Sequence, residues 1–378
     1  MSVKLEEKIT FNKFFKNTSS KPYQISKKDY LENGKYPVVD QGQKFIVGYS
    51  NDEEKLFTDT PIIVFGDHTR IIKYIDFDFI IGADGTKILS AFDDSIDTRY
   101  AYYQLIYTKI ENLGYSRHFK VLREKTFIKS SLSKQKQIAK TLDKAKALIE
   151  LRKESIEKLD ALSRSVFMEM FGDPVENPHN FKIKTLNNFF IDEKNGTKCG
   201  PFGSALKKDE YVDSGIPVWN MDNISKKGKF INKINLMITI DKFNKLENYS
   251  TLNGDIIISR AGTVGKMCVV NSRYENSIIS TNLIRLRLNQ DKLLPLYFIS
   301  LMTYCKKRLK RLETGSDGAL THMSTKVLKS IEFPYPPLDI QNKFAKTIQK
   351  IESQKALYEE QLAKLQENFD ALLARSFT

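Results

Sequence analysis

An internal repeat constrains the fold of this 378-residue chain more than any other feature of its sequence. The segment Leu132–Thr141 recurs 206 positions later as Leu338–Thr347. The match continues upstream at the same offset, where Lys120–Leu122 returns as Lys326–Leu328. A tandem repeat predicts one structural unit that is used twice. We therefore expect two similar lobes, each followed by a similar segment.

The repeated segments have the apolar spacing of long helices. Apolar residues recur every three or four positions from residue 132 and again from residue 338, which is the 3.5-residue period of a coiled coil. Polar breaks in one copy face apolar residues in the other, as Arg152 corresponds to Tyr358 and Lys355 to Ile149. The seam comprises Ile138, Leu142, Ile149, Ile156, Leu159 and Val166 in the first copy, and Phe344, Ile348, Ile351, Tyr358, Leu362, Leu365, Phe369 and Leu372 in the second.

Two long helices that pair with each other are therefore predicted, and a two-fold relation between the copies would make them antiparallel. The alternative is that each helix packs only on its own lobe. A helix of about 35 residues would span about 50 Å, comparable to the roughly 35 Å between half-sites one DNA turn apart.

Each lobe is predicted to mix strands and helices. A β-branched run leads into a glycine turn in both copies, at Pro61–Arg70 and at Gly254–Lys266, which is typical of strand, turn and strand. The predicted fold class is α+β, with two mixed lobes separated by two long antiparallel coiled-coil helices and related by an internal pseudo-two-fold repeat. Helix-stopping residues follow Phe171, so we expect a lobe over 1–131, a helix over 132–172, a second lobe over 173–337 and a C-terminal helix over 338–378.

The charge of the chain favours a polyanionic partner. The formal net charge is +14, whereas the segment 132–171 carries +3 and the segment 338–378 carries none, so the excess lies mainly in the lobes. Simple solubility is the alternative reading of this charge. No stretch is apolar over the roughly 20 residues of a membrane span, and the start of the chain lacks the apolar region of a signal peptide, so a cytoplasmic location is expected.

Signatures of chemistry are lacking in the sequence. Its three cysteines and four histidines are scattered without metal-ligand spacing, so no metal is expected. No methyltransferase tetrad of the Asn-Pro-Pro-Tyr or Asp-Pro-Pro-Tyr type, glycine-rich cofactor loop or Walker phosphate loop occurs. The sequence therefore predicts a non-catalytic protein without a cofactor of its own.

Three blocks of the sequence resemble a known family, the specificity subunits of type I restriction-modification systems. They are Pro334–Gln341, the glycine-containing block Gly254–Lys266, and Gly215–Trp219. The first copy departs from this pattern, because Ser130-Ser131 replaces the proline pair before the helix. The resemblance covers nearly the whole chain.

What the resemblance implies is a subunit with two target-recognition domains that read a split, asymmetric DNA site. The two long helices would set the gap between the half-sites and dock two modification subunits. Those partners would bind S-adenosylmethionine and methylate adenine, and restriction subunits would translocate and cleave double-stranded DNA.

Base reading requires side chains with paired donors or acceptors on loops, such as Arg and Lys for guanine and Asn and Gln for adenine. Loops in both lobes offer such residues. The candidates in the first lobe are Gln41, Gln43, His68, Thr69, Arg70, Lys87, Arg117, His118 and Lys120. The candidates in the second lobe are Ser204, Lys207, Asn220, Asn223, Arg260, Thr263, Lys266, Thr321, His322 and Lys326.

Two other functions stay open at this point. One is a fused nuclease-methyltransferase with an unrecognised catalytic segment, against which the missing motifs argue. The other is a coiled-coil scaffold or DNA-binding regulator that works without a methyltransferase.

Overall fold

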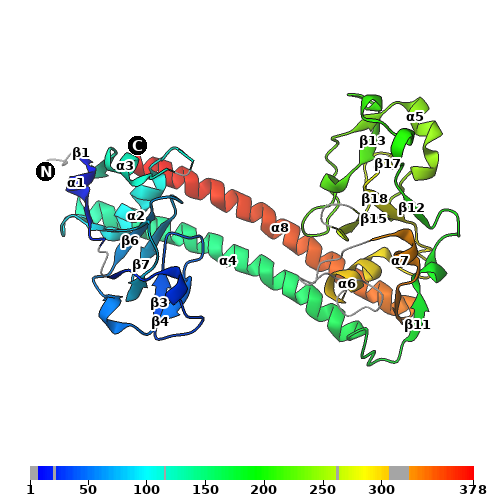
Figure 1. The fold of residues 1–378 in the computed structure, drawn as a ribbon, viewed down its shortest axis with the longest axis horizontal. Coiled ribbons are helices and arrows are strands. Elements are labelled where there is room, and N and C mark those ends of the chain that lie inside the picture. The colour runs from blue at the N-terminus through cyan, green and yellow to red at the C-terminus, as the bar shows by residue number, and fades with distance from the viewer. Residues whose placement is uncertain (1–6, 20–22, 115, 261–263, 306–322) are drawn as a thin grey trace. The chain divides into compact units, whose positions relative to one another are not determined.

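The chain is described here by a computed structural model that forms two compact units. The residues described are 7–19, 23–114, 116–260, 264–305 and 323–378. The first unit combines Met1–Ser155 with Tyr358–Thr378, and the second is Ile156–Leu357. Each unit contains a lobe and a part of two long helices, α4 (Leu132–Phe171) and α8 (Leu338–Phe377) (Figure 1). No helix among the described residues has the length and apolar character that crossing a membrane requires.

The described residues of the first lobe form two four-stranded sheets, a two-stranded ribbon and three short α-helices. One sheet is antiparallel, with the order β2 (Phe15–Asn17), β9 (Thr86–Ala91), β6 (Ile62–Gly66) and β7 (Ile72–Ile75). The other has the order β4 (Gly48–Ser50), β3 (Tyr36–Val39), β8 (Phe79–Ile81) and β5 (Leu56–Phe57), with β3 parallel to β8. The ribbon joins β1 (Glu7–Thr10) to β10 (Thr126–Lys129), and the helices are α1 (Phe11–Phe14), α2 (Thr98–Tyr107) and α3 (Phe119–Arg123).

The second lobe repeats this plan. Its antiparallel sheet has the order β12 (Thr197–Cys199), β18 (Leu283–Leu286), β15 (Ile256–Ser259) and β16 (Met267–Val269). Its mixed sheet has the order β14 (Met237–Ile238), β13 (Ile216–Trp219) and β17 (Ile278–Ile279), with β13 parallel to β17. The ribbon joins β11 (Lys182–Thr185) to β19 (Glu332–Tyr335), and the helices are α5 (Ile240–Lys245), α6 (Pro295–Cys305) and α7 (Thr325–Lys329).

The predicted α+β class and the duplication are confirmed by this arrangement. The two-residue parallel pairing of Val38 with Ile80 in the first lobe returns as the pairing of Val218 with Ile278 in the second. Trp219, which ends β13, is fully buried in a cluster of apolar side chains.

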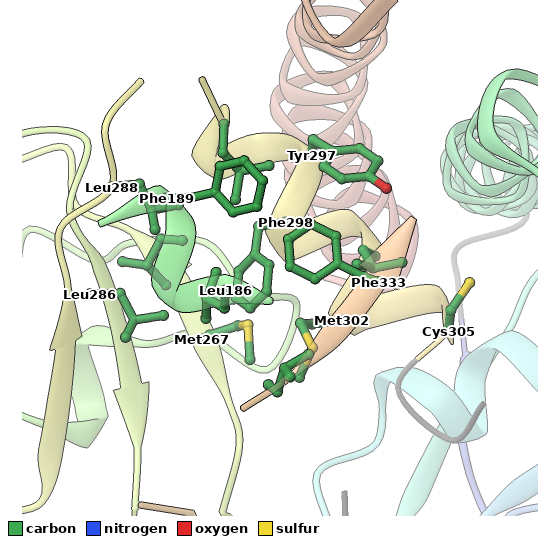
Figure 2. Close-up of a cluster of buried hydrophobic side chains, with 14 of the residues drawn as sticks. Leu186, Phe189, Met267, Leu286, Leu288, Tyr297, Phe298, Met302, Cys305 and Phe333 are labelled. Carbon is green, nitrogen blue, oxygen red and sulfur yellow. The ribbon is translucent and has the colours of Figure 1, made fainter. Parts of the chain in front are cut away.

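The antiparallel sheet of each lobe packs one face on the α2 or α6 helix and on the long helices. In the second unit this core joins Met267 and Leu286 of the sheet to Phe298 and Met302 of α6, and to Phe333 of β19 (Figure 2). Burial of these side chains stabilises the fold by about 25 cal/mol per Å² of apolar surface removed from water.

The two long helices pair within each unit with opposite ends together, so they are antiparallel. In the first unit Leu142 and Ile149 of α4 share a core with Phe369 of α8. In the second unit the rings of Phe167 in α4 and Phe344 in α8 lie 5.7 Å apart. The helices also contribute to the core of the lobe in each unit, so each long helix packs on a lobe as well as on the other helix, and the alternative of packing only on its own lobe is wrong.

All fourteen predicted seam residues are buried or partly buried, but the seam does not keep one spacing to its ends. After Ser163 the buried positions advance by four residues, to Phe167 and Phe171. The second copy does the same after Phe369, with Leu373 and Phe377. A straight α-helix repeats every 3.6 residues, so a helix that also packs on a lobe does not hold the 3.5-residue register.

Two polar residues within the seam, Arg152 and Lys355, contact the opposite helix. The guanidinium of Arg152 lies 4.1 Å from the ring centre of Tyr358, its equivalent in the other copy. Lys355, which is buried, forms an ion pair with Asp160 and lies 3.9 Å from Glu352. The apolar seam of the second unit therefore contains a buried ammonium whose carboxylate partner is partly exposed.

Candidate nucleic-acid interface

In the first lobe, several candidate residues meet where β3, β6 and β8 end. The amide of Gln41 donates to the carbonyl of Asp84 (2.7 Å) and accepts from the backbone N–H of His68 (3.0 Å). The hydroxyl of Thr69 donates to the carbonyl of Gln41 (2.6 Å). Parallel strands end at one edge of a sheet, so the loops after β3 and β8 are neighbours, and a cavity beside them is lined by Gln41, His68, Thr69 and Asp84.

Asp67, which sequence reasoning missed, joins a distant segment to these loops. Its buried carboxylate accepts the backbone N–H of Phe119 (2.9 Å), and its backbone carbonyl accepts the N–H of His118 (2.8 Å). Lys87 lies 4.0 Å from the same carboxylate. The segment with Arg117 and Lys120, both exposed, is thereby held beside the loop after β6.

His118 itself is fully buried. One ring nitrogen contacts the carbonyl of Asp67 (3.0 Å), and the other accepts the N–H of Leu113 (3.2 Å). Both ring nitrogens are thus engaged within the lobe, so His118 supports the surface and does not form part of it.

The other first-lobe candidates differ in exposure. Gln43 is exposed on the loop after β3. Arg70 adopts a positive φ of 60° in the turn after β6, and its guanidinium donates to the carbonyl of Ile110 (3.0 Å). Lys87 is half-buried, with its ammonium 5.5 Å from the ring centre of Phe119.

The second lobe forms the equivalent edge with different side chains. Arg260 is the first residue after β15, as Asp67 is the first residue after β6. The backbone N–H of Arg260 donates to the carbonyl of Asn282 (3.0 Å), and that of Asp67 donates to the carbonyl of Gly85 (2.8 Å). The guanidinium of Arg260 lies 4.7 Å from the ring centre of Phe202. Its Nη1 is buried and has no hydrogen-bond partner among the described residues.

Phe202 is a second residue that sequence reasoning missed. It lies after β12, its side chain is 53% exposed, and its neighbour Ser204 is also exposed. Lys266, just before β16, is half-buried and lines a cavity with Lys226 and Lys227. A large exposed aromatic ring beside a cation suits stacking on a nucleobase.

Asn223 and Asn220 act mainly within the lobe. Asn223 is buried and donates to the carbonyls of Ile231 (2.8 Å) and Lys233 (2.7 Å). Its carbonyl accepts the N–H of Asn220 (2.9 Å), and the side chain of Asn220 accepts the N–H of Asp222 (2.8 Å). The buried side chain of Asn223 therefore holds the loop after β13 through hydrogen bonds to its backbone.

The remaining second-lobe candidates lie apart from this loop. Lys207 is exposed, and its backbone N–H donates to Glu210 (2.7 Å). Lys326 is exposed on α7 at the position that Lys120 has on α3. Thr263, Thr321 and His322 lie outside the described residues.

The described residues contain no group of three or more His, Cys, Asp or Glu side chains that could hold a metal ion. None of the described cysteines, Cys199, Cys268 and Cys305, forms a disulfide. The candidate interface of each lobe is a set of loops with donors, acceptors and cations.

Comparison with known proteins identifies the family. The sequence model of the type I restriction modification DNA specificity domain matches twice, over residues 8–161 and 180–367. The chain belongs to this family.

Among curated relatives, the EcoR124I/EcoR124II specificity subunit of Escherichia coli is 34% identical over 86 residues, which is 22% of this chain and 21% of the relative. The putative MjaX specificity subunit of Methanocaldococcus jannaschii is 23% identical over 208 residues, 54% of this chain and 47% of the relative. The matched region thus spans about a fifth and about half of the length of these two relatives.

Solved structures share the fold over nearly the whole chain. A type I restriction-modification S subunit from M. genitalium superimposes with a TM-score of 0.57 at 19% identity, covering 99% of this chain and 96% of that one. A chain from a study of complex assembly and conformational transition of the type I system gives 0.55 at 15% identity, covering 90% and 91%.

Proposed function

We propose that this chain is the non-catalytic DNA-recognition subunit of a type I restriction-modification complex. It reads a bipartite, asymmetric site in double-stranded DNA, one half with each lobe, and brings partner methyltransferase and restriction subunits to that site. The observation that carries this proposal is the duplicated loop edge, where β6 and β15 end, because Asp67 and Arg260 are at equivalent positions with different chemistry. Two similar scaffolds with different loop chemistry suit two different half-sites.

The proposed division of the chain follows the repeat. Target-recognition domains occupy 1–131 and 173–337, and conserved helices occupy 132–172 and 338–378. A 40-residue helix such as α4 is about 60 Å long, which is sufficient to set the distance between half-sites about one helical turn of DNA apart.

Candidates with exposed or half-buried side chains make the contacts with DNA in this proposal. Arg117, Lys120, Lys207 and Lys326 are exposed cations that suit phosphate oxygens, which position a protein on the duplex. Gln43, Thr69 and Arg260 have donors or acceptors that suit base edges in the major groove. The concentration of net positive charge outside the long helices supports this assignment, because phosphate contacts dominate affinity for DNA.

The long helices are the proposed docking site for two modification subunits. Leu151 of α4 and Leu357 of α8 are equivalent residues in the repeat, and their side chains are 59% and 47% exposed. Leu148 and Leu162 of α4 are also exposed. Exposed apolar residues at equivalent positions suit two copies of one partner. Those partners bind S-adenosylmethionine and supply the methyl transfer.

Methylation mapping tests the proposed function. The chain is expressed with its modification partner, and adenine methylation of the cell's DNA is compared with that of cells lacking the chain. A split, asymmetric motif that is methylated only with the chain present is the expected result. A stable complex that binds DNA without any new motif would instead support a scaffold or regulator, and methyl transfer or cleavage by the purified chain alone would support an enzyme.

A further inference from the structure

A buried lysine in the first lobe donates hydrogen bonds to the loop after β3. Lys73 of β7 is 4% exposed although it carries an ammonium group. Its Nζ donates to the carbonyls of Asp40 (2.8 Å) and Lys44 (2.6 Å) and lies 3.5 Å from that of Phe45. An ammonium has three donors and no acceptor, so three carbonyls of one loop account for its hydrogen-bonding capacity.

This arrangement couples the shape of the loop to the burial of a charge. Burial lowers the pKa of the Lys73 ammonium, and the carboxylate of Asp40 opposes that effect. A buried ammonium is tolerated only where its donors are satisfied. Any opening of the segment 40–45 would leave the charge buried without partners, so the loop that contains Gln41 and Gln43 is fixed in one shape.

The second lobe holds the equivalent loop with a different side chain. In the antiparallel sheet, Lys73 is paired with Val64, and the corresponding pair is Cys268 with Ile257, so a buried thiol takes the place of the ammonium. There Asn223 supports the loop after β13 through three hydrogen bonds, to Asn220, Ile231 and Lys233. Each lobe thus has a buried polar side chain that hydrogen-bonds to the loop after the first strand of its parallel pair, Lys73 to the loop after β3 and Asn223 to the loop after β13.

We infer that Lys73 and Asn223 are positioning residues, each of which fixes the loop that reads one half of the DNA site. Neither side chain is exposed enough to contact DNA itself, so each acts through the loop that it supports. Base discrimination requires donors and acceptors held within fractions of an ångström of their partners. The inference rests on the proposed function and assigns to each residue control of one half-site alone.

The test uses the full chain in its complex with the modification partner and reads the methylated motif. The variants are Lys73→Met, Asn223→Ala and, as a matched control, Lys13→Met, which removes a charge from the exposed face of α1 in the same lobe. Lys73→Met is expected to relax one half of the motif about tenfold and to leave the other half unchanged. Asn223→Ala is expected to relax the opposite half, and Lys13→Met is expected to change neither.

The outcomes are separable. An unchanged motif in Lys73→Met, or equal relaxation of both halves, would overturn the inference. If Lys73→Met abolishes methylation, Lys73→Gln, which keeps two donors, decides: relaxation of one half supports the inference, and complete loss overturns it. The absence of any motif with the unaltered chain is a different result, which removes the proposed function and the inference together.

Discussion

Gln135 and Gln341 lie 206 positions apart, and both are fully buried at the start of a long helix with the same three hydrogen bonds. Each amide carbonyl accepts the N–H that precedes a lobe helix, from Asp97 before α2 (2.8 Å) and from Leu294 before α6 (2.9 Å). The duplication thus extends to individual hydrogen bonds.

The amide nitrogens complete this match. Gln135 donates to the carbonyls of Ser95 (2.9 Å) and Ser130 (2.8 Å). Gln341 donates to those of Lys292 (3.2 Å) and Pro336 (2.9 Å). Each glutamine therefore ties the start of a long helix to its own lobe.

Replacing Gln135 with leucine should destabilise the first unit. The substitution leaves one buried N–H and two carbonyls without partners, a cost of about 3 kcal/mol in the free energy of unfolding. Denaturant unfolding of the full chain measures this cost. Gln137→Leu, two residues further along on the exposed face, should change the free energy by less than about 0.5 kcal/mol, and an equal loss in both variants would contradict the prediction.

The ion pair between Lys355 and Asp160 should respond asymmetrically to substitution. Asp160→Ala leaves a buried ammonium that lacks its nearest carboxylate and should cost about 2 to 3 kcal/mol. Lys355→Ile should be close to neutral, because Ile149 already occupies the equivalent position in the other copy and Asp160 is partly exposed. Thermal unfolding of both variants tests this, and a larger cost for Lys355→Ile would refute it.

Arg260 should act as a base contact and not as a phosphate contact, because the ring of Phe202 fixes the plane of its guanidinium. Arg260→Ala is expected to cost about 1 to 3 kcal/mol of DNA affinity and to relax one position of the motif, with an unchanged salt dependence of binding. Arg273→Ala removes a similar pair, with Tyr274, that lies after β16, and should leave the motif unchanged. A salt slope reduced by about one, without relaxation, would assign Arg260 to phosphate instead.

The thiol of Cys268 should resist alkylation in the native chain. Burial raises its pKa to about 12, so the reactive thiolate is scarce at pH 8. Because the folded pKa exceeds the unfolded one, the associated stability is present below about pH 8.5 and is lost as the pH rises towards 12. Iodoacetamide labelling followed by mass spectrometry should modify the partly exposed Cys199 first, and early labelling of Cys268 would show that the lobe opens.

Introducing a charge at Leu151 or Leu357 should remove one modification subunit at a time. Leu151→Asp and Leu357→Asp are each expected to yield a complex with one partner, because the equivalent site stays intact. Native mass spectrometry of the purified complex measures the number of partners. Glu150→Asp, adjacent to Leu151 and equally exposed to solvent, serves as the control, and two partners in every variant would rule out this docking face.

Periodic features were predictable from the sequence because they depend on local spacing. The long helices, their seam and the duplicated lobes all follow from positions 132–172 and 338–378 and the pattern before them. The drift of the seam to Phe167 and Leu373 was not predicted, because it depends on the lobe against which each helix end packs.

The roles of polar residues were less predictable. His118 and Asn223 have side chains that suit base reading, yet both are buried and support loops. Lys73 lies on β7, and the alternation of apolar and polar residues along a strand does not reveal that its ammonium contacts three carbonyls. Such roles depend on contacts between segments that are distant in sequence, and one sequence alone does not show which distant segments are in contact.

In a duplicated chain, α4 could pair with a second copy of α4, and α8 with a second copy of α8. The ion pair between Lys355 and Asp160 disfavours such homotypic pairs. A second α8 would present Gln366 where α4 presents Asp160, so the ammonium would be desolvated without a carboxylate. Two copies of α4 would place Arg152 against Arg152 in the position where Tyr358 now receives it. The small sequence differences between the two copies thus favour the pairing of α4 with α8 over the pairing of either helix with a copy of itself.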